Sequence, residues 1–300
     1  MSALTIPYEL PSKDVGWLKR DVLLFALSIG CTVGELHFLY EFHPKFAVFP
    51  TYSIILPFKL TDEEVTDYFA RQSLPSVPGM PKFDPKRGVD GERKLTIFKP
   101  LPTSSAGKSF ELRSRVIGIY DKGKAGTVIE TEQSIVDKRT SEVYSRAVGS
   151  AFLIGKATGA GLKDQFPPRT PIPRTGCQMP ALRFRLTTRL HICTGSTGTT
   201  TPSTQLPIWA GGAILHGLYS WNAVAHGILK EVGFSNPRAL REFSARFASP
   251  AKPGDTLITK LWTVGTGEDG FEDIRFVTMN QTGKPVLSNG RALLRRHSAL

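Results

Sequence analysis

The same order of segments occurs in both halves of this chain, and it restricts the fold more than any other sequence feature. Each half contains an apolar segment with helical spacing, followed by long segments in which apolar and polar residues alternate as in half-buried strands. Turn residues at 121–124 and 137–140 separate strand-like segments of the first half, which predicts antiparallel hairpins. A helix followed by long strands predicts an α+β fold in which a sheet wraps around the helix.

In the first half, we expect a helix over residues 14–40 that begins at Asp14 and is ended by the Cys-Thr-Val-Gly stretch at 31–34. A second, short helix is expected at about 61–71, and the Pro- and Gly-rich residues 72–92 are expected to form a loop. The strand-like segments follow at 93–101, 109–123, 126–140 and 142–155.

Residues 156–180 contain five prolines and three glycines, and we expect them to form a linker. The second half then contains, in order, a short strand-like segment at 181–192, a Thr-, Ser- and Gly-rich loop at 193–206, a helix from about 215 to 232, and strand-like segments at 239–249, 255–267, 271–283 and 286–297. The sequence therefore predicts an N-terminal repeat at 1–155 and a C-terminal repeat at 181–300, joined by the linker.

Composition limits the class of protein. Hydrophobic residues make up 40% of the 300 residues and charged residues 21%, which is enough apolar material for two ordinary domains. The formal net charge is +12, but the basic residues are scattered and do not form a stripe interleaved with aromatic residues. We weigh a plain solvated basic surface first, an anionic small molecule second and nucleic acid last.

The cysteines and the apolar runs indicate where such a protein would work. Cys31, Cys177 and Cys193 are too few and too far apart for a disulfide framework or a structural zinc site, so we expect a reducing compartment and no metal or other cofactor. The first residues do not resemble a signal peptide, and no apolar stretch reaches the roughly 18 residues that a membrane span needs. We expect a soluble, intracellular protein.

Several segments carry a resemblance to one family. Residues 214–229, ILHGLYSWNAVAHGIL, are similar to the segment that opens the central helix in the C-terminal half of hydratase 2 enzymes. Residues 15–59, 92–105 and 117–132 resemble the hydratase portion of peroxisomal multifunctional enzyme type 2. The chain is thus identified as a member of the MaoC-like, hydratase 2 family. The resemblance implies a double hot-dog fold, made of two repeats in which an antiparallel sheet wraps a long helix.

The resemblance also implies a reaction. Members add water to a trans-2-enoyl thioester or remove it from an (R)-3-hydroxyacyl thioester, and coenzyme A enters only as part of that substrate. The N-terminal repeat helps to house the acyl chain, and the C-terminal repeat carries the chemistry. A Gly-Asp-x-Asn-Pro-Leu-His segment supplies an Asp and a His as the acid–base pair and an Asn that orients the water.

This signature segment is damaged here, and two alignments remain open. In one, His191 stands for the catalytic His, and the Asp and Asn are absent. In the other, residues 195–198 stand for Gly-Asp-x-Asn and the His position falls near Thr201, so that both acid–base residues are absent. Neither alignment restores the acid, because no Asp occurs between Asp164 and Asp255. Loss of one member of an acid–base pair typically costs ~10²–10⁴-fold in rate.

The candidate site residues follow from these alignments. His191 is the catalytic candidate, weighed against a hydrogen-bonded strand histidine. His216 and Gly217 are candidates for substrate binding, because N–H groups at a helix N-terminus suit a thioester carbonyl oxygen; for His216 a structural role is weighed against this one. Trp209, Trp221 and Asn222 are candidates for lining the substrate tunnel, weighed against a place in the core.

A second departure from the family pattern lies in the first half. Residues 89–92 read Val-Asp-Gly-Glu where the family commonly has His-Gly-Glu, so that Asp90 replaces a His. We interpret Asp90 as an acid on a surface loop in preference to an independent catalytic group.

Three functions are consistent with this sequence. The first is a MaoC-like hydratase or dehydratase that acts on an enoyl or 3-hydroxyacyl thioester or a related polyketide-like substrate. The second is a repurposed hot-dog enzyme of specialised metabolism that promotes an isomerisation, dehydration or pericyclic step on a non-CoA substrate. The third is a non-catalytic acyl-binding partner subunit. We expect a small-molecule substrate, neither nucleic acid nor membrane as partner, and we consider a homodimer. The final Ser298-Ala299-Leu300 is an imperfect peroxisomal signal, which gives a cytoplasmic or peroxisomal localisation.

Overall fold

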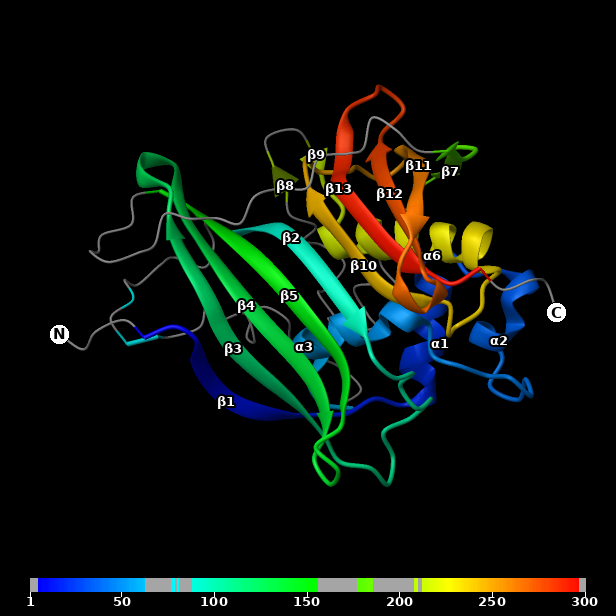
Figure 1. Cartoon of the computed structure of the whole chain (residues 1–300), viewed down its shortest axis with the longest axis horizontal. Helices are drawn as coiled ribbons and strands as arrows, with labels where there is room; N and C mark the ends of the chain where they lie inside the picture. Colours follow the sequence, from blue (N-terminus) through cyan, green and yellow to red (C-terminus); the bar gives the residue numbers. More distant parts are fainter. Residues whose placement is uncertain are drawn as a thin grey trace.

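The sheet of this protein continues across both halves of the chain. The structure is a computed structural model that describes residues 5–62, 77–78, 80, 88–155, 177–185, 208–209 and 212–296. Its main sheet has 11 strands in the order β1-β3-β4-β5-β2-β10-β13-β12-β11-β6, with β7 also paired to β11, and the neighbouring strands are antiparallel. The pairing of β2 with β10 joins the strands of the first half to those of the second (Figure 1).

The bounds of the elements are as follows. The first half contains β1 (Tyr8–Val15), α1 (Lys19–Ser28), the 3₁₀ turn η1 (Val33–Glu35), α2 (Leu36–Leu39), the 3₁₀ turn η2 (Pro50–Ile55), α3 (Leu56–Lys59), β2 (Gly88–Ile97), β3 (Phe110–Asp121), β4 (Gly126–Asp137) and β5 (Val143–Ile154). The second half contains β6 (Cys177–Gln178), β7 (Leu182–Arg185), β8 (Ile208–Trp209), β9 (Gly212–Ala213), α6 (Gly217–Gly233), β10 (Leu240–Phe247), β11 (Thr256–Thr266), β12 (Glu272–Met279) and β13 (Pro285–Leu294).

The long strands and the helix of the second half are confirmed. Strands β3, β4 and β5 and strands β10 to β13 lie within a few residues of the alternating segments, and α6 covers the helix expected from about 215 to 232. In the linker expected at 156–180, residues 156–176 lie outside the described residues, and Cys177 and Gln178 form β6. The short helix expected at 61–71 lies outside them from residue 63 onward.

The helix expected over 14–40 is confirmed only for Lys19–Ser28, which stops before the 31–34 stretch as expected, and its start at Asp14 is wrong. Asp14 belongs to β1, where it pairs with Glu111 of β3, and α1 begins only at Lys19. The start of α1 is fixed by the carboxylate of Asp21, which accepts the N–H of Leu18 (2.8 Å). The helix ends before Gly30, whose φ of 103° lies in the left-handed region that glycine adopts without strain.

Helices α1 and α6 share one hydrophobic core with the inner face of the sheet. Val22 and Phe25 of α1 belong to the same cluster of buried residues as Val224 and Ile228 of α6, and Phe243 of β10 lies with them. Burying each such side chain stabilises the fold by about 1.5–3 kcal/mol. Most of the surface of α6 is buried in this core, so packing contributes much of the stability of the helix.

Aromatic side chains fill the interior of the first half. Trp17 contacts Phe110 with ring centroids 4.9 Å apart, and Phe25 contacts Tyr52 edge to face at 5.3 Å. The indole Nε1 of Trp17 donates to the carbonyl of Pro102 (2.8 Å). Burial, together with the nearby Asp21 carboxylate, raises the pKa of the Tyr52 hydroxyl well above its ordinary value.

A buried carboxylate connects the first half to α6. Glu35 is only 2% exposed, and it accepts hydrogen bonds from the Ser235 hydroxyl (2.7 Å) and the backbone N–H of Thr32 (3.1 Å) and lies 2.9 Å from Nε2 of His226. Burial alone would raise the pKa of Glu35, but the interactions with His226, Ser235 and Thr32 outweigh it and lower that pKa to about 2. The buried Cys31 lies beside this network, and burial raises the pKa of its thiol.

We expect Glu35→Gln to lower the free energy of unfolding by about 3–5 kcal/mol at neutral pH, because it leaves His226 and Ser235 without their charged partner. The folded-state pKa is depressed from 4.5, so this stabilisation is present above pH 4.5 and is lost as the pH falls towards 2. Denaturant unfolding of both proteins across that pH range measures the difference.

Glu142→Gln is the matched control, because Glu142 forms an exposed pair with Lys99 (2.6 Å). We expect it to change the free energy of unfolding by less than about 1 kcal/mol. Equal effects of the two substitutions would show that the buried network contributes no special stability.

Candidate active site

The start of α6 is built around His216. His216 is the N-cap of the helix, and its Nδ1 accepts the backbone N–H of Leu218 (3.2 Å). Its own carbonyl accepts the N–H of Tyr219 (3.0 Å). Because Nδ1 is the acceptor, we assign the proton of the neutral imidazole to Nε2.

Charged groups of β2 act on this imidazole. Burial lowers the pKa of His216, the carboxylate of Asp90 opposes that shift, and the guanidinium of Arg93 adds to it. The ring is therefore neutral at neutral pH, and it can donate a hydrogen bond from Nε2 without carrying a charge.

Gly217 follows at the first position of the helix, where the backbone approaches β10 closely. A Cβ atom at Gly217 would lie 3.0–3.1 Å from ring carbons of Phe247. A larger residue would therefore have to move the helix start or the ring. This contact explains why glycine occupies the position that the sequence predicts for substrate binding.

Trp221 and Asn222 point into the protein. The indole of Trp221 is fully buried and meets the ring of Phe243 edge to face at 4.5 Å. Asn222 donates from Nδ2 to the carbonyl of Leu218 (2.8 Å), and its Oδ1 accepts the hydroxyl of Thr51 (2.6 Å). Asn222 thus links α6 to η2, and a role of either residue in substrate binding stays a prediction.

The remaining sequence candidates are described only in part or not at all. Trp209 belongs to β8, which pairs with β9, but its side chain lies outside the description. His191, residues 195–198 and Thr201 also lie outside the described residues, so the choice between the two alignments stays open.

Asp90 is a site residue that the sequence placed wrongly. It lies in β2, and not on a surface loop, and it pairs with Ala151 of β5. Its Oδ1 accepts a hydrogen bond from Nη2 of Arg93 (2.8 Å), and the side chains are only 27% and 14% exposed. The structure therefore brings an acid, a guanidinium and His216 to one end of the seam between the two halves.

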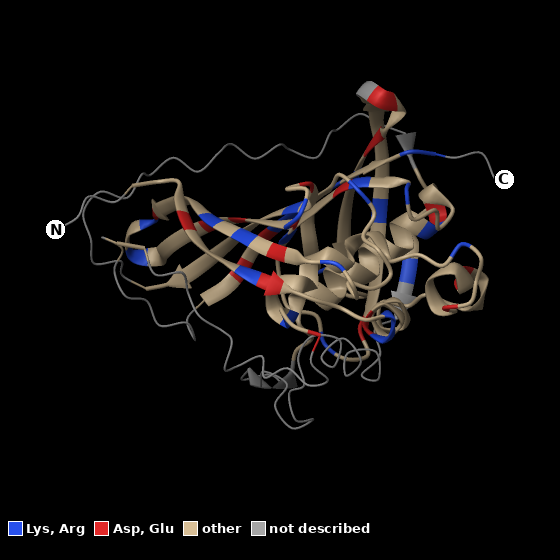
Figure 2. Ribbon diagram, turned by 90° about the horizontal axis from the view of Figure 1, so that it is seen from below, with Lys and Arg blue, Asp and Glu red and all other residues tan. Residues whose placement is uncertain are grey.

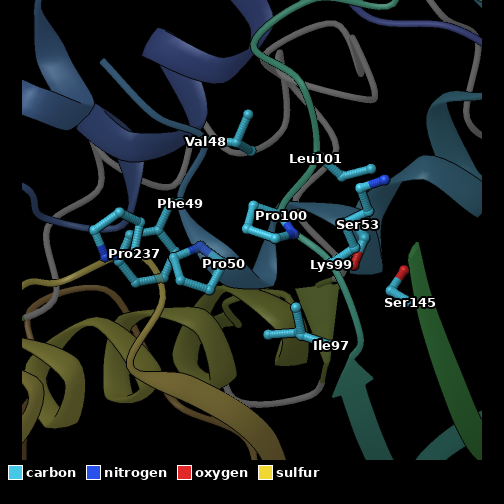
Figure 3. A pocket seen from close by; sticks show the side chains of 10 residues that line it. All are labelled: Val48, Phe49, Pro50, Ser53, Ile97, Lys99, Pro100, Leu101, Ser145 and Pro237. Atoms are coloured by element: carbon cyan, nitrogen blue, oxygen red, sulfur yellow. The ribbon is translucent and has the colours of Figure 1, made fainter. Parts of the chain in front are cut away.

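The opposite end of β2 carries no comparable group. A small hollow there is lined mainly by apolar side chains, among them Ile97, Pro100 and Pro237 (Figure 3). The ammonium of Lys99 pairs with the carboxylate of Glu142 (2.6 Å) beside it. Of the two ends of β2, the start of the strand is thus the one where described groups suited to proton transfer lie, beside the start of α6.

Charges elsewhere are interspersed. Basic and acidic residues alternate along the described strands, as the scattered sequence pattern predicts (Figure 2). Arg115 pairs with Glu132 (2.8 Å), and Arg275 pairs with Asp273 (2.9 Å). No helix within the described ranges has both the length and the apolar character needed to cross a membrane. The tripeptide 298–300 lies outside those ranges.

Comparison with known proteins identifies the family of this chain. Residues 17–155 match the family model of the MFE-2 hydratase 2 N-terminal domain, and residues 208–284 match that of the MaoC like domain. A probable dehydratase, NIT22, of Ajellomyces capsulatus is 39% identical over 307 residues, which span 96% of this chain and 81% of that protein. A probable enoyl-CoA hydratase 2 of Dictyostelium discoideum is 26% identical over 297 residues, spanning 96% of this chain and 95% of that one.

A solved structure resembles the whole fold. The crystal structure of a MaoC-like dehydratase from Phytophthora capsici superimposes with a TM-score of 0.80 at 25% sequence identity and covers 97% of each chain. Two halves that enclose helices with one antiparallel sheet define a double hot-dog protein. This chain belongs to the MaoC-like, hydratase 2 family.

We expect Gly217→Ala to lower the free energy of unfolding by about 1–3 kcal/mol, because the added methyl group overpacks the contact with Phe247. Combining it with Phe247→Leu, which removes the ring, should recover most of the loss. Thermal unfolding of the two single variants and the double variant measures this coupling.

Gly34→Ala serves as the control, since a Cβ there would meet nothing within 4 Å. If the double variant were less stable than the sum of its single variants predicts, close approach to Phe247 would not be the reason for glycine at this position.

Proposed function

We propose that this chain is a hydro-lyase that removes water from a 3-hydroxyacyl thioester or a related polyketide-like carbonyl compound, or adds it back. Membership of the family supports this proposal, as do relatives named as a probable dehydratase and as a probable enoyl-CoA hydratase 2. The more similar of these two relatives is the dehydratase, which favours the direction of water loss.

The observation that carries the proposal is the start of α6. The N–H groups of Leu218 and Tyr219 are bonded to His216, and we assign the N–H of Gly217, at the first position of the helix, to a ligand oxygen. It lies at the positive end of a helix of 17 residues. A carbonyl oxygen that gains negative charge as the α-proton leaves would be stabilised there.

His216 would supply the second donor to the same oxygen. Its Nδ1 is held by the helix cap, so the ring orientation is fixed and Nε2 carries the proton. A neutral donor suits an enolate, because it stabilises the developing charge without adding a fixed cation to the site. Neither Gly217 nor His216 needs to transfer a proton in this arrangement.

We keep His191 as the proposed catalytic histidine of the parent alignment. We likewise keep residues 1–155 as the repeat that receives the acyl or related chain and residues 181–300 as the repeat that bears the site, with 156–180 between them. The carbonyl of the substrate would thus lie at the start of α6, next to the seam.

The test is turnover by the purified protein. We expect it to interconvert 3-hydroxyacyl and trans-2-enoyl thioesters, followed by the ultraviolet absorbance of the conjugated double bond. A series of acyl lengths, together with 3-hydroxy carbonyl compounds that lack the thioester, defines the substrate class. No conversion of any of them in either direction, at high protein concentration, would refute the proposal.

We expect His191→Ala to lower kcat by ~10²–10⁴-fold, as loss of an acid–base residue does. His43→Ala is the matched control, since His43 contacts the backbone of Lys45 on an exposed segment, and we expect it to leave the rate unchanged. Equal rates for the two variants would remove His191 from the mechanism and would favour the alignment that places the His position near Thr201.

A second candidate function is favoured by the missing acid. With no Asp between Asp164 and Asp255, the same scaffold would act on a more reactive, non-thioester carbonyl compound by dehydration or isomerisation. Conversion of the non-thioester compounds alone in the panel above would support this function over the first.

A further inference from the structure

Two charged residues of β2 lie on the inner face of the sheet. Asp90 pairs with Ala151 of β5 and Arg93 pairs with Gly149, and these two partners are two residues apart on one strand. Side chains two apart on a strand share a face, and cross-strand partners share it too. Leu95 follows on the same face and is fully buried. Asp90 and Arg93 therefore point towards the core side of the sheet.

This common face depends on one extra residue. Residues three apart in a regular strand point to opposite faces, so Asp90 and Arg93 could not meet without an irregularity. The register between β2 and β5 shifts at Gly91, where two steps along β2 match one step along β5. A Cβ atom at Gly91 would lie 2.8 Å from Oγ and 3.2 Å from the carbonyl oxygen of Ser150, so a larger residue would crowd this bulge.

The surroundings of Arg93 are shaped to hold its guanidinium inside. Its partners on the two sides are Gly149 and Ala245, and a Cβ at Gly149 would lie 2.4 Å from Nη1 of Arg93. The guanidinium lies over the ring of Phe58, 5.8 Å from its centroid. Nε is buried without a hydrogen-bond partner among the described residues. A buried donor of this kind is unfavourable, so the guanidinium is held at this place by its other contacts.

The ion pair also faces the start of α6. Arg246 of β10 pairs with Glu92 of β2 at the end of the seam, and Phe247 comes next on β10. The ring of Phe247 lies against Gly217, so the helix start is next to the segment of β2 that contains the bulge. The effect of the Asp90 carboxylate on His216 agrees with this placement.

We propose that Asp90 is the catalytic acid–base residue of this site and that Arg93 is its positioning residue. This inference rests on the proposed function. Arg93 holds Oδ1 of Asp90 in place, and Oδ2 would then be the oxygen that meets the substrate. The carboxylate thus takes the place of the acid that the signature segment lacks, from the other half of the chain.

Asp90 can carry the proton through the whole step, and His191, as its partner in the parent alignment, would orient the departing hydroxyl group. Oδ2 removes the proton from the α-carbon, and the electrons of that C–H bond form an enolate whose oxygen is bound by the N–H of Gly217 and Nε2–H of His216. The enolate then re-forms the carbonyl, the double bond forms, and the bond from the β-carbon to the hydroxyl breaks. The carboxylic acid of Asp90 gives its proton to that hydroxyl, which leaves as water, and the carboxylate is regenerated.

Asp90→Asn is the first test, because it keeps the size of the side chain and an acceptor for Arg93 but cannot take a proton. On a substrate that the wild type converts, we expect kcat to fall ~10²–10⁴-fold with little change in KM. Asp121→Asn is the matched control, since the Asp121 carboxylate accepts the N–H of Gly123 in the exposed β3–β4 turn, and we expect the wild-type rate. Thermal unfolding checks that both variants are folded.

A second readout separates proton transfer from a structural role. With a substrate deuterated at the α-carbon, we expect a larger kinetic isotope effect on kcat for Asp90→Asn than for the wild type, because removal of the proton becomes slower. Arg93→Lys keeps the charge but loses the fork of donors, so we expect a smaller rate loss than for Asp90→Asn.

Three results would overturn the inference or its basis, and they can be told apart. A wild-type rate for Asp90→Asn would remove Asp90 from the reaction while the proposed function stands. A rate loss with an unchanged isotope effect would assign Asp90 to a structural role. Absence of turnover by the wild type on every compound would refute the proposed function itself.

Discussion

The hydrogen bonds between β2 and β10 are the constraint on which the rest of this structure depends. They turn two half-sheets into one, and they place the start of α6, from the second half, beside a strand of the first. The helix has most of its surface buried, and Asn222 and His226 bind it to Thr51 and Glu35 of the first half. The buried pair of Glu35 and His226 adds a polar link across the same boundary, because each group would be costly to bury without the other.

The candidate active site uses that boundary. In the proposed function, the N-terminus of α6 in the second repeat binds the oxyanion, and the charged groups of β2 that act on His216 come from the first repeat. Inner faces of sheets are normally apolar, and burying an ion pair there costs free energy of folding. An ion pair at this place therefore suggests a functional role. The small residues Gly149 and Ala245 on either side of Arg93 leave room for its guanidinium. The guanidinium in turn holds the carboxylate of Asp90 by a hydrogen bond.

Local patterns in the sequence were sufficient for the long strands and for α6, because their alternation or helical spacing persists over ten or more residues. They failed where the conformation of a residue depends on a strand that is distant in the sequence. Asp14 reads as a helix cap, but its pairing with Glu111 of β3 makes it part of a strand. Asp90 reads as a loop acid, because the glycine after it and the loop-like residues before it hide a strand that is defined by β5 and β10. The helix start at His216 could be predicted because the motif and the helix cap both involve residues that are adjacent in the sequence.

The bulge at Gly91 has a consequence for how such chains should be compared. Successive side chains of a strand point to opposite faces of the sheet. The number of residues between Asp90 and the buried Leu95 therefore decides which face the carboxylate reaches. A homologue that kept the acid but lacked one codon in this interval would carry the same letters and present the carboxylate to solvent. In this part of the chain, an alignment gap is therefore as informative as a substitution.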